Sequence, residues 1–170
     1  MADTRPLYDQ DFIAWSKQQA EALRAAARAG SNLPIDWENL AEEVETLGAS
    51  ERRALYSQIH RVIRHLLKLE TSPAIEPRRG WVETVEDARS QIEFVLEMSP
   101  RLRNEEEAAV AAGLARASRE TIRDLQKYGE IDRAGVSKTG VSKIRAARYT
   151  ADQVLGDWLP PGSVVKHRSP

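Results

Sequence analysis

Cysteine is absent from the chain of 170 residues. Its absence excludes disulfide bonds, cysteine nucleophiles and zinc sites built on thiolates, and it is typical of a reducing compartment. Long apolar runs are also absent, and the segment that follows Met1–Pro6 lacks the apolar stretch of a secretion signal. These absences predict a cytoplasmic protein that neither spans nor binds a membrane.

Aromatic residues are scarce, at 6% of the chain, whereas 41% of the residues are hydrophobic and 30% are charged. The formal net charge is -1, unlike the strongly basic composition of most nucleic-acid-binding domains. Apolar residues recur every three or four positions, and the alternation typical of strands is missing. The pattern predicts an all-α protein, and the length predicts a single-domain helical bundle.

One long helix, about 36–70, is the central element of the predicted bundle. Asp36 is a suitable N-cap, and Gly48 is the position at which we consider a bend. A single apolar stripe is expected to face the other helices along its whole length. The stripe consists of Leu40, Val44, Leu47, Leu55, Ile59, Val62, Leu66 and Leu69.

Shorter helices are expected on both sides of the long helix. They cover about 9–28, 81–99, 101–128 and a short C-terminal stretch of 149–155. Gly113 and the alanines around it would let a neighbouring helix approach closely. Thr150 is the expected N-cap of the terminal helix, and Trp158 is expected to pack back on the bundle.

The predicted domain organisation has three parts. An N-terminal arm covers residues 1–6, the helical bundle covers 7–159, and a flexible tail covers 160–170. The bundle includes a basic loop over 131–148, with some helix near 142–148, in which Gly-Val-Ser-Lys occurs twice. This loop is a candidate contact for an anionic partner, although a solvated loop is the simpler interpretation.

Three stretches of sequence carry a resemblance to a known family. They are 7–15 (LYDQDFIAW), 37–48 (WENLAEEVETLG) and 65–68 (HLLK). Together they resemble the DUF29 family, a bacterial family of domains of unknown function, and the resemblance extends over about 7–159. It implies a small α-helical bacterial domain and brings no established activity, cofactor or catalytic residue.

The long helix is electrically divided, with acidic residues before position 52 and basic residues after it. The predicted basic surface consists of Arg53, His60, Arg61, Arg64, Lys68, Arg78 and Arg79. One interpretation is contact with nucleic-acid phosphates, and another is an antiparallel pairing of two copies, acidic half against basic half. A third is a solvated surface that complements the helix dipole.

A second set of polar residues follows the edge of the apolar stripe. Glu51, Gln58 and His65 are spaced by seven residues, and Glu43 precedes them. The four residues are a possible polar pocket, but neighbours in this column are two helical turns apart, roughly 10 Å. Structural hydrogen bonds to other helices are therefore the simpler interpretation.

Motifs for catalysis and metal binding are not present. The sequence lacks the Glu-x-x-His pairs of di-iron bundles and the His-Glu-x-x-His motif, and it has no nucleophile elbow. We therefore expect no cofactor and no resident metal. The most direct prediction is a non-catalytic protein-interaction or regulatory module whose partner is another protein or a second copy.

Two alternatives stay open at this point. The first is a nucleic-acid-binding accessory protein that uses the basic surface. The second is a metal-dependent enzyme whose site would draw on Glu42, Glu45, Glu51 or His65.

Overall fold

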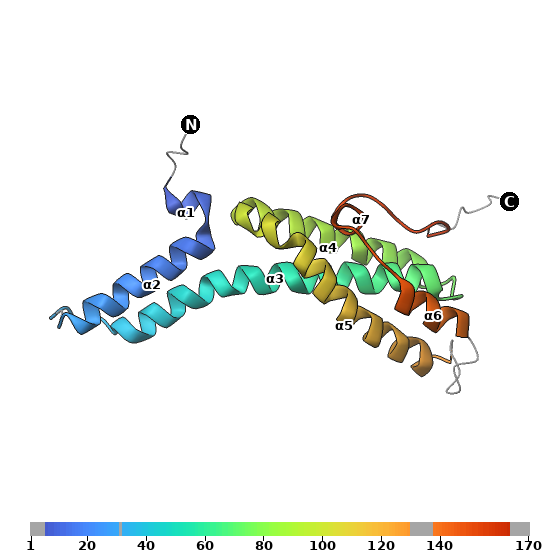
Figure 1. The fold of residues 1–170 in the computed structure, drawn as a ribbon, viewed down its shortest axis with the longest axis horizontal. Coiled ribbons are helices and arrows are strands. Elements are labelled where there is room, and N and C mark those ends of the chain that lie inside the picture. The colour runs from blue at the N-terminus through green and yellow to red at the C-terminus, as the bar shows by residue number, and fades with distance from the viewer. Residues whose placement is uncertain (1–5, 31, 130–137, 164–170) are drawn as a thin grey trace. The chain divides into compact units, whose positions relative to one another are not determined.

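A computed structural model of the chain describes residues 6–30, 32–129 and 138–163, and the regular structure in these ranges is helical (Figure 1). In chain order the elements are α1 (Leu7–Gln10), α2 (Phe12–Arg28), α3 (Trp37–Thr71), α4 (Arg78–Met98), the 3-10 helix η1 (Pro100–Glu105), α5 (Glu106–Lys127), α6 (Lys138–Ala146) and α7 (Ala151–Leu155). The predicted all-α class, the long helix and the short terminal helix are confirmed. Within the described ranges, no helix combines the length and the apolar character that crossing a membrane requires.

The described residues form two compact units. Unit 1 contains the residues up to Leu55 together with Phe94–Asn104, and unit 2 contains Tyr56–Glu93 and the described residues from Glu105 onward. Helices α3 and α4 therefore contribute residues to both units.

Unit 1 begins with a break in the predicted helix of 9–28. Asp11 leaves the helical conformation and caps α2, because its carboxylate accepts a hydrogen bond from the Ala14 backbone N–H at 3.0 Å. Tyr8 precedes this break, and its ring packs edge-on against the rings of Phe12 and Trp15, which follow it. The prediction of one continuous helix is wrong here, since a capping carboxylate at Asp11 separates α1 from α2.

Helix α3 runs antiparallel to α2 through its N-terminal half (Figure 1). It starts after Asp36, whose carboxylate accepts from the Asn39 backbone N–H at 3.3 Å, as expected for an N-cap. The helix continues without interruption through Gly48, which packs against Ser16 of α2. A Cβ on Gly48 would collide with the Ser16 hydroxyl and lie 3.2 Å from the Ile13 Cα, so glycine allows the two helices to approach closely here.

The predicted apolar stripe of α3 does not keep one buried face. In unit 1 the buried positions are Ala41, Gly48 and Leu55, whereas Leu40 and Leu47 are exposed. Gly48 thus faces α2, whereas Leu40 and Leu47 are left in solvent. The prediction is wrong for these two leucines because close packing of two helices selects small residues for the contact.

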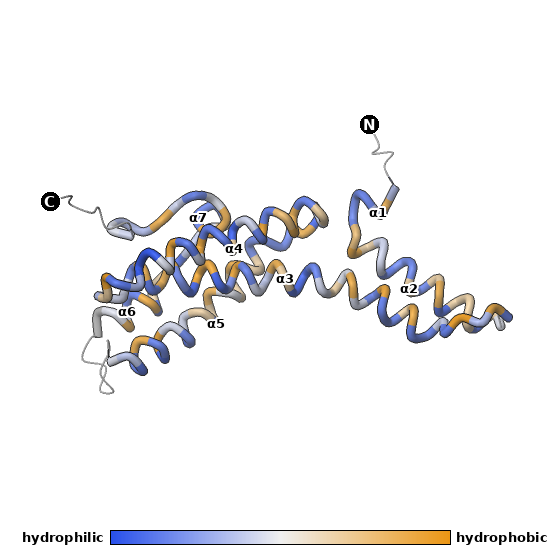
Figure 2. The backbone as a smooth tube through the Cα atoms, turned by 180° about the vertical axis from the view of Figure 1, so that it is seen from behind, coloured by the Kyte–Doolittle hydropathy of each residue, from blue (hydrophilic) through white to orange (hydrophobic). Residues whose placement is uncertain are grey.

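Unit 2 contains most of the apolar core. The second half of α3 lies beside α4, α5 and α6, and apolar residues recur along each of these helices (Figure 2). Gly113 of α5 packs against α3 at Ile63 and at the backbone of His60, as the small-residue pattern predicted. The fully buried side chains of this core include Ile59, Val62, Ile63, Leu66, Leu67, Val85, Ala88 and Ala117.

The C-terminal part of the chain is more regular than the sequence analysis predicted. Helix α6 begins at Lys138, so the prediction of a loop is wrong over 138–141. Its Ile144 is buried because the helix packs on α5. Residues 130–137 and 164–170 of the predicted loop and tail lie outside the described residues, as do 1–5 of the predicted arm. Pro160 and Ser163, which fall in the predicted tail, are buried.

Helix α7 has the predicted cap. Thr150 and Gln153 form a capping box, in which each side chain accepts a hydrogen bond from the other residue's backbone N–H. Trp158 packs back, with its ring centroid 6.1 Å from that of Tyr149. Arg89 of α4 secures the segment, because its guanidinium donates to the backbone carbonyls of Val154 and Trp158 at 2.9 and 2.7 Å.

Candidate functional site

Part of the predicted basic surface faces another helix of unit 2 and not solvent. His60, Arg64 and Lys68 are spaced by four residues on α3, and Glu120 and Asp124 have the same spacing on α5. The two helices therefore bring opposite charges together along their contact. We call this set the charge cluster; its members are His60, Arg64, Lys68, Arg116, Glu120 and Asp124.

Short contacts hold the charge cluster together. Asp124 Oδ2 accepts from Arg64 Nη2 at 2.5 Å and lies 2.7 Å from Lys68 Nζ. Glu120 Oε1 accepts from Arg116 Nε at 2.9 Å. His60 Nε2 is buried 3.0 Å from Glu120 Oε2, without the geometry of a hydrogen bond.

The protonation states follow from these surroundings. Burial lowers the pKa of His60 although the Glu120 charge acts in the opposite direction, so the imidazole is neutral near pH 7. The hydrogen bond from Arg116 lowers the pKa of Glu120. Burial by itself would raise the pKa of Asp124, but the hydrogen bonds from Lys68 and Arg64 outweigh it, and the pKa is lowered. Both carboxylates are therefore ionised and compensate the cations beside them.

The remaining members of the predicted basic surface are distributed over several local contacts. Arg78 donates to the backbone carbonyl of Leu69, at the end of α3, at 2.6 Å. Arg79 pairs with Glu83 one turn along α4, fully in solvent. Arg53 and Arg61 are exposed. Carboxylates and carbonyls thus bind part of the donors of Arg64, Lys68 and Arg78 within the fold.

The four residues of the predicted polar pocket are not gathered in one place. All lie on α3, and steps of seven or eight residues separate them by two turns. His65 Nδ1 lies 2.9 Å from the Arg61 carbonyl oxygen, and burial lowers the pKa of this imidazole. Gln58 has its side-chain oxygen buried without a hydrogen-bond partner among the described residues. Glu43 is exposed, and Glu51 is half-buried.

Two cavities in unit 2 were not predicted. The first, about 340 Å³, adjoins the charge cluster, and Lys68 Nζ there lies 5.9 Å from the centroid of the Trp81 ring. Its lining consists of Lys68, Pro77, Trp81, Asp124, Leu125 and Tyr128. Because Asp124 binds both Lys68 and Arg64, this cavity presents an engaged carboxylate and aromatic walls to a ligand.

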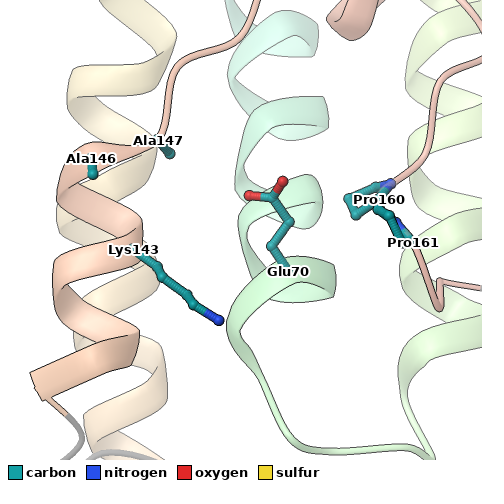
Figure 3. Close-up of a pocket in the computed structure, with 6 residues that line it drawn as sticks. All are labelled: Glu70, Lys143, Ala146, Ala147, Pro160 and Pro161. Carbon is teal, nitrogen blue, oxygen red and sulfur yellow. The ribbon is translucent and has the colours of Figure 1, made fainter.

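The second cavity, about 400 Å³, is shown in Figure 3. Glu70 and Lys143 face it from α3 and α6, and two prolines line its other side: Pro160 and Pro161. The Tyr149 hydroxyl donates to Glu70 Oε2 at 2.7 Å, and burial together with this carboxylate raises the pKa of the phenol. Glu70 is therefore engaged through Oε2 with a phenol that stays protonated.

Unit 1 presents a different surface, on the outward face of α3. Leu40 and Leu47 are 41% and 52% exposed, and a seven-residue step leaves them about 20° apart around the helix. Glu43 and Glu51 lie close to the same line, within about 60° of a leucine. We call Leu40, Glu43, Leu47 and Glu51 the leucine–glutamate stripe.

Exposed apolar residues are concentrated in this unit. Among the described residues, nine large apolar side chains are exposed, and all but Ile75 and Tyr128 belong to unit 1. Unit 1 members are Tyr8, Leu33, Ile35, Leu40, Leu47, Phe94 and Met98. Exposed apolar residues that lie together on one face are typical of protein-interaction surfaces, and the two leucines of the stripe share a face of α3. Sequence reasoning missed the surface because helical periodicity alone assigns its leucines to the core.

Comparison with known families gives a match over residues 7–158, nearly the whole described chain, to the family described as Domain of unknown function DUF29. The chain belongs to the DUF29 family. The resemblance noted in the sequence is thereby confirmed, and no curated protein sequence matches the chain.

The fold of this DUF29 protein is also seen in a solved structure. An α-helical protein of unknown function from Rhodospirillum rubrum, known from its crystal structure, matches with a TM-score of 0.58 and 21% sequence identity. The match covers 92% of this chain and 99% of the other. It supports the helical architecture, and at this identity it carries no information on activity.

Metal binding by the DUF29 chain receives no geometric support in the part that the structure describes. No group of three or more His, Asp and Glu side chains there is arranged to hold an ion. The suggested residues Glu42, Glu45, Glu51 and His65 all lie along α3. Glu45 accepts a hydrogen bond from Arg24 of α2 at 2.8 Å and so serves the contact between the helices.

Proposed function

We propose that this DUF29 protein is a non-catalytic protein-interaction module and that the leucine–glutamate stripe is its binding surface. One observation carries the proposal: in the N-terminal half of α3, Ala41 and Gly48 are buried whereas Leu40 and Leu47 are exposed. A helix that served only its own fold would place Leu40 and Leu47 in the contact with α2. Keeping them in water costs hydrophobic free energy, about 1 kcal/mol or more for each, which a partner would recover.

The charge cluster supports the same proposal from the other unit. Its carboxylates bind Arg64, Lys68 and Arg116 within the fold, so these cations are engaged by the protein itself. The nucleic-acid alternative loses Arg64 and Lys68 as free phosphate contacts and keeps the exposed Arg53, Arg61 and Arg79.

Site-specific photo-cross-linking tests the proposal. A photoreactive amino acid at position 47 reports what touches the stripe in cells that express the protein, and the same group at the exposed Arg119 on α5 is the control. We expect protein adducts from position 47 and none from position 119. Adding the substitution Leu40→Gln to the variant labelled at position 47 should abolish the adduct. It should not lower the melting temperature, since the Leu40 side chain is exposed. Equal adducts from both positions, or none from position 47, would refute the proposal.

A further inference from the structure

We infer that the partner of the leucine–glutamate stripe is a cationic amphipathic helix of another protein. The inference rests on the proposed function and specifies the chemistry of the partner. An amphipathic helix presents apolar residues at intervals of three, four and seven positions, which match the seven-residue separation of Leu40 and Leu47. The partner's leucines or comparable residues would cover these two side chains.

The charges on the stripe select a basic partner. Glu43 and Glu51 are interspersed with the two leucines, and neither forms an ion pair or a side-chain hydrogen bond with the residues that the structure describes. The surrounding segment 36–51 has acidic residues and no Lys or Arg. Its acidic members are Asp36, Glu38, Glu42, Glu43, Glu45 and Glu51. A partner with Lys or Arg beside its apolar residues would neutralise the two free carboxylates of the stripe.

A second copy of this chain is a poorer occupant. Two stripes facing each other would bring Glu43 and Glu51 of both copies together and add like charges to the interface. In a pairing of the acidic half with the basic half of α3, Arg64 and Lys68 are already bound to Asp124. The exposed Arg53 and Arg61 would then supply fewer charges to an antiparallel self-pairing than the sequence suggests.

A matched set of synthetic peptides tests the charge preference. The peptides share one amphipathic pattern of leucines and differ only in their polar positions, which change stepwise from lysine to glutamate. Binding to the full chain is followed by fluorescence anisotropy at rising salt. We expect affinity to increase with the number of lysines and to weaken with salt, because the favourable charges lie at the edge of an exposed surface.

Three double variants separate the stripe from general electrostatic attraction. The variant Glu43→Lys/Glu51→Lys should weaken the lysine-rich peptides by about tenfold and improve binding of the glutamate-rich ones. The control Glu93→Lys/Glu107→Lys changes the net charge equally at exposed positions on α4 and α5 and should leave both series unchanged. The variant Leu40→Gln/Leu47→Gln should abolish binding of every peptide while the circular dichroism melting curve stays the same.

Three results would overturn the inference. They are equal binding of the lysine and glutamate series, no binding of any peptide at low salt, and an equal effect of the control variant. Sequencing the partner segment cross-linked to position 47 distinguishes this failure from failure of the proposed function. An acidic or uncharged segment, or a second copy of the chain, would refute the cationic helix and leave the interaction module intact, whereas absence of any adduct would refute both.

Discussion

Gly48 of α3 lies so close to Ser16 of α2 that a Cβ on Gly48 would come within 2.1 Å of the Ser16 hydroxyl oxygen and 3.2 Å of the Ile13 Cα. The hydroxyl also donates to the Ile13 carbonyl at 2.9 Å, so it is held on the contact side of α2. We predict that Gly48→Ala destabilises the protein by about 1–3 kcal/mol, measured by chemical denaturation, because the Ile13 backbone itself must shift.

The matched control is Gly80→Ala in α4, where a Cβ would meet nothing within 4 Å. Alanine is the better helix former, so this variant should be more stable than the parent by up to about 1 kcal/mol. The double variant Ser16→Ala/Gly48→Ala should recover part of the loss, since the shortest contact is then gone. Equal changes in the free energy of unfolding for Gly48→Ala and Gly80→Ala would contradict the close packing of α2 on α3.

The sequence was informative about helices and less so about the faces they bury. Asp36, Thr150 and Gly113 behave as predicted, because caps and close-packing residues act through local geometry that the sequence states directly. Leu40 and Leu47 do not, because periodicity shows that a helix has an apolar face and cannot show which neighbour is near enough to cover it.

The charge cluster was missed for a related reason. On one helix, His60, Arg64 and Lys68 form a basic surface, and only the packing of α5 brings Glu120 and Asp124 to them. The four-residue spacing on both helices was the signal available in the sequence. Pairing the two rows requires knowing which helices are neighbours, and that is a property of the tertiary fold.

Asp124 should be the most sensitive carboxylate of the charge cluster. The substitution Asp124→Asn removes the negative charge that Arg64 and Lys68, both partly buried, share. We predict a loss of about 1–3 kcal/mol in the free energy of unfolding. The control Glu83→Gln breaks an exposed pair with Arg79 and should cost under about 0.5 kcal/mol. Equal losses in the two variants would contradict a structural role for the cluster.

Acid should destabilise the protein in two steps. Burial lowers the pKa of both His60 and His65, so the unfolded chain binds more protons than the native one below about pH 6.5. Their contribution is complete above about pH 6.5 and is lost as the pH falls toward their native values. The lowered pKa values of Glu120 and Asp124 give a second loss below about pH 4.5.

Melting temperatures measured between about pH 7.5 and about pH 5 test the first step. The variants His60→Gln and His65→Gln should each reduce the slope, since each removes one group that titrates differently in the two states. Glu83→Gln serves as the control and should leave the slope unchanged, because Glu83 is exposed. A parent protein whose melting temperature is constant over this range would refute the assignment of buried neutral histidines.

Arg89 should determine whether the C-terminal segment stays on unit 2. Its guanidinium donates to three backbone carbonyls, those of Gln153, Val154 and Trp158, at 2.7 to 2.9 Å. Arg89→Met keeps much of the side-chain length and leaves all three acceptors without this donor, so we expect a loss of about 2–3 kcal/mol. Hydrogen exchange should accelerate in α7 and the residues after it before it changes in α3 or α5.

Arg148→Met is the control, because Arg148 is exposed and donates to the nearby carbonyls of Arg145 and Ala147. Unchanged exchange in α7 of the Arg89→Met variant would show that apolar packing of Val154 and Trp158 alone holds the segment.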